Sequence, residues 1–153
     1  MTPTPHLTRE QTEVFVKALI PFYESLTPQG IEDFDSFYAP DAAFKDPFNH
    51  VSDLTAIKKI FRHMFVQVND PAFTINKHIV GEGDAIIFWE FNFRFRGLGC
   101  KEQQCLEGVS HLAFNPDGKV TLHRDYWDAA GELYSRLPVV GFFMRGLQRM
   151  MRA

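Results

Sequence analysis

The stretch Trp89-Glu90-Phe91-Asn92-Phe93-Arg94-Phe95-Arg96 decides the fold class of this chain. Aromatic and polar residues alternate along it without a miss, and a period of two is the period of a β-strand. Four rings therefore project from one face of the strand and four polar side chains from the other. A strand of this kind is typical of an antiparallel sheet with one packed and one solvated face.

Similar strands are expected on both sides of this stretch. Residues 73–80 alternate in the same way and lead into it through the turn Gly81-Glu82-Gly83-Asp84. After a Gly97-Leu98-Gly99 turn, residues 100–114 form a long strand. The sequence therefore predicts a meander of antiparallel strands.

The last hairpin decides which polar residues share a face. Asn115-Pro116-Asp117-Gly118 is a turn sequence that returns the chain into a strand over 119–127. If Asn115 pairs with Gly118, Ser110 lies opposite His123. The residues that would share this face are Ser110, Leu112, Phe114, Thr121, His123, Asp125 and Trp127. A bulge in the turn would shift this register.

Helices are expected before the strands. Thr8 and Gln11 fit a capping box, and the helix that follows should be kinked or shortened by Pro21. The apolar face of this helix is expected to hold Val14, Phe15, Ala18, Leu19, Phe22 and Leu26. Thr27-Pro28 opens a second helix, which carries Ile31, Phe34, Phe37 and Tyr38.

A short strand and a third helix complete this part of the chain. Residues 42–48 are typical of a brief edge strand that Pro47 ends, with Phe44 and Asp46 on one face. The third helix begins near Ser52-Asp53, stops at Asn69-Asp70-Pro71 and is expected to expose Lys58, Lys59 and Arg62.

Length and charge narrow the class of protein. A chain of 153 residues has about the length of one domain. Its formal net charge of −3 argues against nucleic-acid binding, which usually requires a basic surface. The first residues show no signal-peptide pattern, and no apolar run reaches the length of a membrane span. A cytoplasmic location is the expectation. Two cysteines and six histidines show no ligand spacing, so neither a metal nor a cofactor is predicted.

Three segments are expected along the chain: a flexible leader over 1–7, a domain over 8–130, and a basic amphipathic helical extension over 131–153. Residues 136–153 hold four Arg and no acid, so they carry +4, which leaves −7 for the rest. The extension should present Val139, Val140, Phe143, Leu147, Met150 and Met151 as an apolar face. Packing on its own domain or on a dimer partner is preferred to contact with an anionic membrane.

Three stretches carry a resemblance to a known family. They are the Phe37–Pro47 run FYAPDAAFKDP, the helix containing Ile57-Lys58-Lys59-Ile60-Phe61, and the Ser110–Val120 run SHLAFNPDGKV. In order and spacing, over about residues 10–130, they resemble the NTF2-like superfamily, particularly its SnoaL-like branch. The resemblance implies an α+β cone, in which a highly curved antiparallel sheet wraps around N-terminal helices and leaves a pocket. It also implies a homodimer formed through the outer face of the sheet.

The superfamily includes ketosteroid isomerase, limonene epoxide hydrolase, scytalone dehydratase and polyketide cyclases, as well as non-catalytic binding proteins. Asp46 matches the position of the isomerase's general base. Ser110 stands where that enzyme has a protonated oxyanion-hole Asp, and Tyr23 lies just beyond the stretch that matches its oxyanion Tyr. The resemblance therefore supports the fold more fully than any one reaction.

Four residues are candidates for chemistry. Asp46 is expected to face into the cone between Phe44 and Phe48. Apolar walls would raise its affinity for a proton, so it would act as a base. The alternative is that Asp46 is only a turn residue or a helix cap. His123 and Asp125 share a face and would form an acid/base relay, with Ser110 as hydrogen-bond donor. The same three residues would equally form a satisfied buried polar network.

The rings provide a surface for a ligand. The pocket wall is expected to consist of Phe44, Trp89, Phe91, Phe93, Leu112, Phe114 and Trp127. The first hypothesis is therefore cofactor-independent proton transfer, isomerisation, hydration or dehydration of a small apolar ring-containing molecule. The second is a non-catalytic binding or carrier module for such a molecule.

Overall fold

A computed structural model describes residues 6–97, 101–134 and 138–152. Residues 1–5 of the expected leader and residues 98–100, which include part of a predicted turn, lie outside the described residues. Leu7 is buried against the domain, so the packed part of the chain begins before residue 8.

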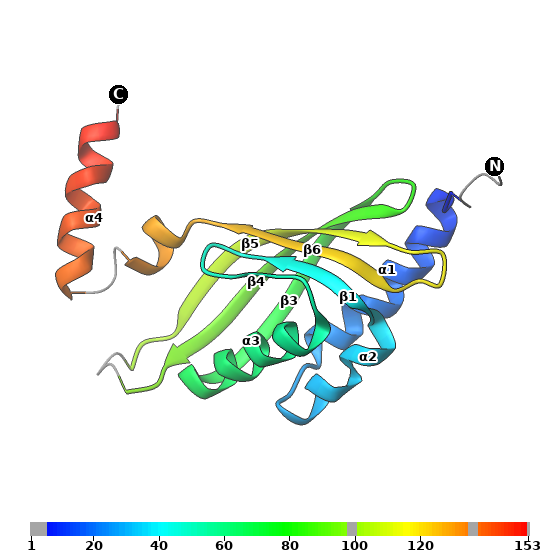
Figure 1. The fold of residues 1–153 in the computed structure, drawn as a ribbon. Helices are drawn as coiled ribbons and strands as arrows, with labels where there is room; N and C mark the ends of the chain where they lie inside the picture. Colours follow the sequence, from blue (N-terminus) through cyan, green and yellow to red (C-terminus); the bar gives the residue numbers. More distant parts are fainter. Residues whose placement is uncertain (1–5, 98–100, 135–137, 153) are drawn as a thin grey trace.

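Six strands form one sheet in the order β2-β1-β6-β5-β4-β3. Their bounds are β1 Tyr38–Lys45, β2 His50–Val51, β3 Val68–Val80, β4 Asp84–Phe95, β5 Gln104–Phe114 and β6 Val120–Trp127. Neighbouring strands are antiparallel, except that β1 and β6 are parallel. The sheet is long and strongly curved (Figure 1).

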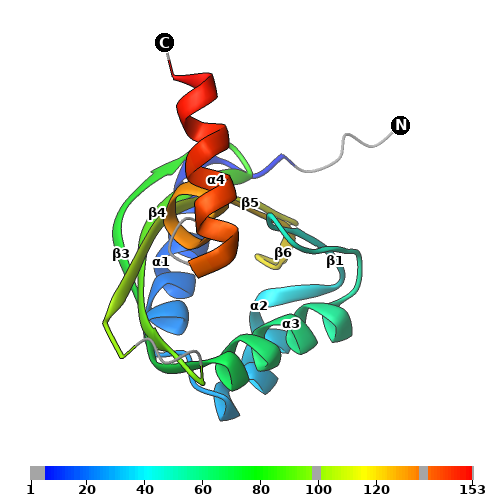
Figure 2. The same ribbon diagram turned by 90° about the vertical axis from the view of Figure 1, so that its left-hand side faces the viewer.

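The helices lie on the concave side of this sheet (Figure 2). They are α1 Arg9–Glu24, the 3-10 turn η1 Gln29–Asp33, α2 Phe34–Phe37 and α3 Leu54–Gln67. A further short helix, η2 Ala129–Leu133, and α4 Pro138–Met151 follow the sheet. The predicted α+β cone is therefore confirmed.

The aromatic strand has the expected alternation. Ala85, Ile87, Trp89, Phe91 and Phe93 of β4 are all buried, and the residues between them are more exposed. The rings stack across strands as well as along them: the centroids of Phe73 and Phe91 lie 4.4 Å apart. This face of β4 forms much of the core of the cone.

Helix α1 begins as predicted but is rotated from the expected face. Thr8 and Gln11 form both bonds of the capping box, at 2.9 and 3.2 Å. The helix continues through Pro21 and ends at Glu24, before Leu26, which the sequence placed on its apolar face. Val14 and Ala18 are exposed, because the buried stripe is Thr12, Val16, Leu19 and Tyr23. Thr12 tolerates burial because its hydroxyl accepts a hydrogen bond from the backbone N–H of Gly83.

The next segments differ in extent from the prediction. The second helix is only η1 and α2, and Tyr38 belongs to β1. Strand β1 is neither brief nor a free edge, because it pairs with β6 on one side and with β2 at its end. It tolerates Pro40 because the pairing with β6 shifts register between Tyr38 and Ala43.

Helix α3 begins at the predicted cap, where the Asp53 carboxylate accepts a hydrogen bond from Ala56 N at 2.7 Å. Val68, expected on this helix, begins β3 instead. The expectation that Lys58 is exposed is wrong: its stem is buried, and its ammonium contacts Asp35 at 2.8 Å and Glu32 at 3.3 Å. A long stem with a paired charge at its end can be buried in this way.

The pairing of β5 with β6 is shifted by two residues from the predicted register. Ser110 lies opposite Asp125, and Leu112 lies opposite His123. Two changes of one residue each add up to this shift: the turn pairs Asn115 with Lys119 rather than with Gly118, and an irregularity follows between Ala113 and Phe114. A shift of two keeps each side chain on its face, so Ser110, His123 and Asp125 still point the same way. Near the turn, Val120 rather than Thr121 takes the buried position beside Phe114.

Helix α4 stands apart from the cone (Figure 1). It borders the domain across an open hollow of about 510 Å³ between residues such as Ala130 and Leu147. Phe142, Phe143 and Met150 are largely exposed, so the apolar face expected to pack on its own domain is uncovered. None of the helices within the described residues is both long and apolar enough to cross a membrane.

Gly108 provides a test of the packing inside the cone. A Cβ added to Gly108 would fall within 3.0 Å of three atoms of the Trp89 ring, which lies across the strand pair. Because this ring is buried, Gly108→Ala should cost about 1–3 kcal/mol in the free energy of unfolding. Chemical denaturation measures this change. Gly146→Ala, whose Cβ meets nothing within 4 Å, is the control and should not be destabilised. Equal stability of the two variants would contradict this packing.

Candidate functional site

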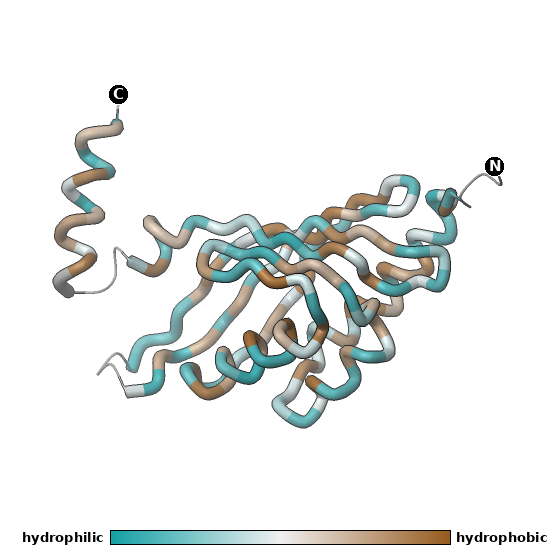
Figure 3. Tube along the Cα trace, viewed as in Figure 1, coloured by the Kyte–Doolittle hydropathy of each residue, from teal (hydrophilic) through white to brown (hydrophobic). Residues whose placement is uncertain are grey.

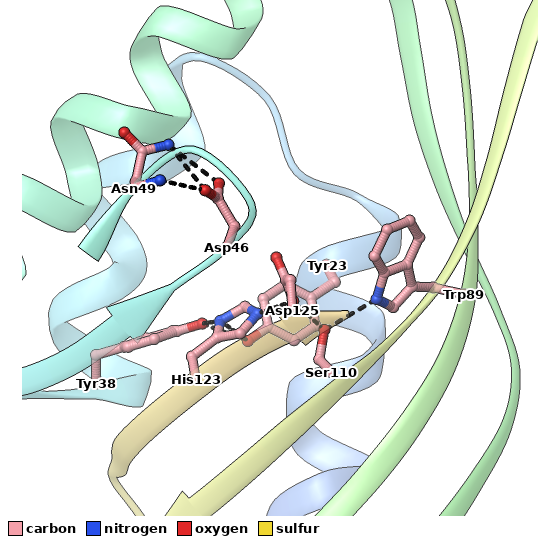
Figure 4. Close-up of polar contacts among 8 residues, drawn as sticks. All are labelled: Tyr23, Tyr38, Asp46, Asn49, Trp89, Ser110, His123 and Asp125. Atoms are coloured by element: carbon pink, nitrogen blue, oxygen red, sulfur yellow. Dashed lines mark hydrogen bonds and ion pairs between the residues drawn. The ribbon is translucent and has the colours of Figure 1, made fainter. Parts of the chain in front are cut away.

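A continuous chain of hydrogen bonds runs through the interior of the cone (Figure 4). It contains Tyr23, Tyr38, His123, Asp125, Ser110 and Trp89, in that order. The Tyr38 hydroxyl lies 2.6 Å from His123 Nδ1, and His123 Nε2 lies 2.7 Å from Asp125 Oδ1. Trp89 Nε1 donates to Ser110 Oγ at 2.9 Å.

Five elements bring these residues together. Tyr23 comes from the last turn of α1, Tyr38 begins β1, and Trp89 lies on β4. The strands β5 and β6 place Ser110 directly opposite Asp125. His123 and Asp125 share a face because they are two residues apart on one strand. The site therefore depends on the curvature that brings α1 and β1 close to the β4-β5-β6 sheet.

The donors along this chain have one consistent direction. A carboxylate only accepts hydrogen bonds, so His123 Nε2 and the Ser110 hydroxyl both donate to Asp125 Oδ1. In a neutral imidazole Nδ1 then accepts, and the Tyr38 hydroxyl donates to it. Burial raises the pKa of both Tyr23 and Tyr38 well above the ordinary value, which keeps the two hydroxyls protonated. Every donated proton therefore points toward Asp125.

Asp125 is also the member of the chain that reaches the surface. Its side chain is 16% exposed, whereas that of His123 is 5% exposed. It borders a hollow of about 270 Å³ together with Lys45, Asp46, Arg124 and Trp127. The hollow forms because the pairing of β1 with β6 ends at Lys45 opposite Arg124, while β6 runs on to Trp127.

Asp46 borders the same hollow, but its carboxylate has a structural role. It lies just after β1, where Oδ1 accepts hydrogen bonds from Phe48 N at 2.7 Å and Asn49 N at 2.6 Å. The Asn49 side chain donates to both carboxylate oxygens at 3.1 Å. The carboxylate points toward Asn49 and away from the hydrogen-bond chain (Figure 4). This is the turn role that the sequence left open as an alternative.

The structure thus brings three of the four candidate catalytic residues into direct contact. Ser110, His123 and Asp125 are bonded to one another, and Asp46 joins them only as a neighbour around the hollow. Among the residues expected to line a pocket, Trp127 borders this hollow. The other six belong to the buried core, and they are Phe44, Trp89, Phe91, Phe93, Leu112 and Phe114.

Sequence reasoning missed the two tyrosines and the indole N–H as parts of the site. The sequence could have indicated these residues, because each carries a hydroxyl or N–H group at a position that the apolar pattern predicts to be buried. Such a group needs a partner inside the domain. Tyr38 and Tyr23 find theirs in each other and in His123, and Trp89 finds Ser110.

Carboxylate, imidazole and thiolate side chains are the groups from which a metal site is usually built. Across residues 6–97, 101–134 and 138–152, no group of three or more His, Cys, Asp or Glu is arranged to hold a metal ion.

The fold and this site define the class of protein. A curved sheet around α1–α3, with a polar hydrogen-bond chain in its interior, is the NTF2-like architecture. The sequence pattern of the SnoaL-like domain matches residues 20–123, which is more than half of the chain. The chain therefore belongs to the SnoaL-like domain family. No curated protein sequence matches it.

Solved structures share the fold at low sequence identity. A hypothetical protein from Catenulispora acidiphila with a ketosteroid isomerase-like fold, in complex with trimethylamine, is 13% identical, with a TM-score of 0.66 over 80% of this chain and 91% of its own. A protein assigned as a SnoaL-like polyketide cyclase from Shewanella denitrificans is 17% identical, with a TM-score of 0.66 over 80% and 98%. An epoxide hydrolase of the LEH-like type from M. tuberculosis is 13% identical, with a TM-score of 0.64 over 92% and 94%.

Removal of single hydroxyls tests the direction of the hydrogen-bond chain. Tyr38→Phe leaves His123 Nδ1 buried without its donor and should cost about 1–3 kcal/mol in the free energy of unfolding. Tyr23→Phe removes only the outermost donor and should cost about 0.5–1.5 kcal/mol. Chemical denaturation gives both values. Tyr23 cannot replace Tyr38 without a shift, because its hydroxyl lies 3.5 Å from Nδ1. A larger loss for Tyr23→Phe would contradict the assigned direction.

Proposed function

We propose that this SnoaL-like protein catalyses a proton transfer, isomerisation, hydration or dehydration of a small apolar ring-containing molecule, with Asp125 as the base. One observation carries the proposal. Asp125 receives every donor of a buried hydrogen-bond chain and is the member of that chain that borders the hollow. A base held in one orientation beside a small site has the geometry that general acid/base catalysis needs.

In this proposal the catalytic roles of the candidate residues differ from those expected from the sequence. His123 is a positioning residue, because both its ring nitrogens already have partners inside the domain. Ser110 holds the same carboxylate oxygen from the other side, which leaves Oδ2 of Asp125 for a substrate proton. Asp46 is a second carboxylate at the hollow, held in its turn by Asn49. All the groups that the reaction needs come from this chain.

The hollow supports a small substrate with one polar group. Trp127 and Pro47 provide apolar surface, and Lys45 and Arg124 provide positive charge at the same hollow. Positive charge beside a base stabilises an oxygen that becomes negative as the base removes a proton from a neighbouring carbon. A cyclic ketone is the simplest molecule with this combination of ring, oxygen and acidic C–H.

Asp125→Asn tests the assigned base. Asn keeps an oxygen that accepts from Ser110 and His123, so folding should be preserved while proton abstraction is lost. In D2O, NMR follows exchange of the α-protons in a panel of cyclic ketones and enones. Exchange catalysed by the wild type should fall about 100-fold or more in the variant.

Asp46→Asn is the matched control, since it makes the same chemical change at the other carboxylate of the hollow. We expect it to retain most of the exchange rate and to fold normally. Loss of exchange in Asp46→Asn, with exchange retained in Asp125→Asn, would transfer the role of base to Asp46. Loss in both would assign the reaction to a pair of carboxylates.

Non-catalytic binding is the second candidate function, and a specific observation favours it. Every buried side-chain nitrogen and oxygen among the described residues has a hydrogen-bond partner, which is typical of a network that stabilises a fold. Native mass spectrometry of the purified protein would reveal a retained small molecule. Binding that survives His123→Ala, with no exchange or turnover of the bound molecule, would favour the carrier over the enzyme.

We also infer that the protein is a cytoplasmic homodimer formed through the outer face of the sheet. A row of apolar residues crosses that face: half-buried Phe88 lies opposite half-buried Val109, which lies opposite the exposed Tyr126. Apolar side chains on the solvent side of a sheet are the usual centre of such an interface.

Val109→Glu should convert the dimer into a monomer, because it places an unpaired charge at the centre of the row. Size-exclusion chromatography with light scattering measures the mass. Val66→Glu makes the same substitution at an exposed position of α3 and should leave the dimer intact. A wild-type chain that is monomeric at all concentrations would contradict the proposed interface.

A further inference from the structure

Helix α4 has two chemically distinct sides. Arg145, Arg149 and Arg152 follow one another at spacings of four and three, which puts the three cations on one side. Val140, Phe143 and Leu147 have the same spacing and lie on the opposite side. The alternation of hydrophilic and hydrophobic segments along the helix is visible in Figure 3. The helix is therefore amphipathic and basic.

The apolar side of α4 is largely exposed, and it borders the domain only across the open hollow between Leu147 and Ala130. Phe143 is 69% exposed and Met150 is 84% exposed. Within the described residues of the domain, the exposed large apolar side chains are scattered over different elements, and they are Val14, Phe48, Val66, Ile79 and Tyr126. Scattered single residues do not form a receptor surface for a helix. Apart from the apolar row on the outer face of the sheet, which is assigned above to the dimer, the described part of a second copy therefore offers α4 no contiguous apolar surface.

Charge argues against pairing of α4 with the α4 of a second copy. Residues 138–152 contain three Arg and no Asp or Glu. Two such helices would bring together like charges with no opposite charges to pair with them. The occupant that complements this helix is an apolar layer with negative charge at its surface, which is the chemistry of an anionic lipid bilayer.

The dimensions of α4 agree with binding at a membrane surface. Its 14 residues extend about 21 Å along the axis, so it is too short to cross a bilayer but able to lie in the interface. Because residues 138–152 contribute +3 to the net charge of −3, the rest of the chain has a charge of −6 and would be repelled by anionic lipid. Since α4 projects away from the cone (Figures 1 and 2), much of that charge is separated from the surface. Screening beyond about 8 Å weakens the repulsion further.

We propose that α4 docks the protein on an anionic membrane surface, with Phe143 and Leu147 inserted at the level of the headgroups and the arginines facing the lipid charge. This docking is separate from the chemistry proposed for Asp125. It would place the small-molecule site proposed at the hollow beside Asp125 near the phase in which apolar molecules dissolve.

Vesicle flotation with the full chain tests the docking. The probes are vesicles of pure phosphatidylcholine and vesicles in which phosphatidylserine replaces about 30% of it. We expect binding to the anionic vesicles alone, and release in about 0.5 M NaCl. The triple variant R145Q/R149Q/R152Q should bind about 100-fold more weakly, and F143S/L147S at least about 10-fold more weakly. Asp125→Asn should bind like the wild type.

The matched control removes three exposed cations from elsewhere in the chain. R9Q/K59Q/K101Q makes the same change in net charge and should retain binding, because the effect depends on α4. Circular dichroism verifies that each variant is folded. Equal binding to the two vesicle types, no binding at low salt, or equal loss in the control would overturn the proposal. So would a larger assembly, detected by light scattering, that F143S/L147S abolishes, since a second copy would then be the occupant.

Discussion

The hydrogen bonds of His123 are the constraint on which the rest of this structure depends. One ring nitrogen faces the Tyr38 hydroxyl and the other faces the Asp125 carboxylate, so a single side chain connects the start of β1 to β6. Tyr23 extends the connection to α1, and Ser110 and Trp89 extend it to β5 and β4. A buried imidazole is costly unless its ring nitrogens have partners. Its two partners come from the paired strands β1 and β6, and α1 adds Tyr23 from the concave side of the sheet, which also encloses the aromatic core.

The irregular pairing along β1 and β6 explains why the site opens where it does. Between Tyr38 and Ala43 the register of β1 shifts, which brings Phe44 beside His123 and Lys45 beside Arg124. The chain then leaves the sheet in the turn held by Asp46 and Asn49. Because β1 stops there, the last residues of β6 have no strand beside them on that edge, and Asp125 borders the hollow. Asp46 thus shapes the opening through its turn, whether or not it also takes part in chemistry.

The sequence predicted the parts of this fold that depend on local patterns. The alternation of β4, the Thr8 capping box, the Asp53 cap and the hairpin after Phe114 were all readable, because each depends on neighbouring residues. The length of β1, the burial of Lys58 and the register of β5 against β6 were not, because each is decided by contacts between distant segments. The face of Ser110, His123 and Asp125 was predictable even with the wrong register, since the error was an even number of residues. The tyrosines were missed because their partner lies 85 and 100 residues away.

The sixteen phenylalanines of the chain serve two physically different purposes. Those on the inner face of β4 and on α1–α3 fill the cone, where contacts between rings are worth more than buried area alone. Phe142 and Phe143 of α4 contact each other but remain largely exposed beside arginines, and exposed ring surface costs free energy in water. Phenylalanine therefore stabilises the folded domain inside the cone, and on α4 it favours transfer of the helix into an apolar layer such as a membrane. The charge around the ring distinguishes the two: the buried rings lie among apolar neighbours, and the exposed rings lie on a helix of uniformly positive charge.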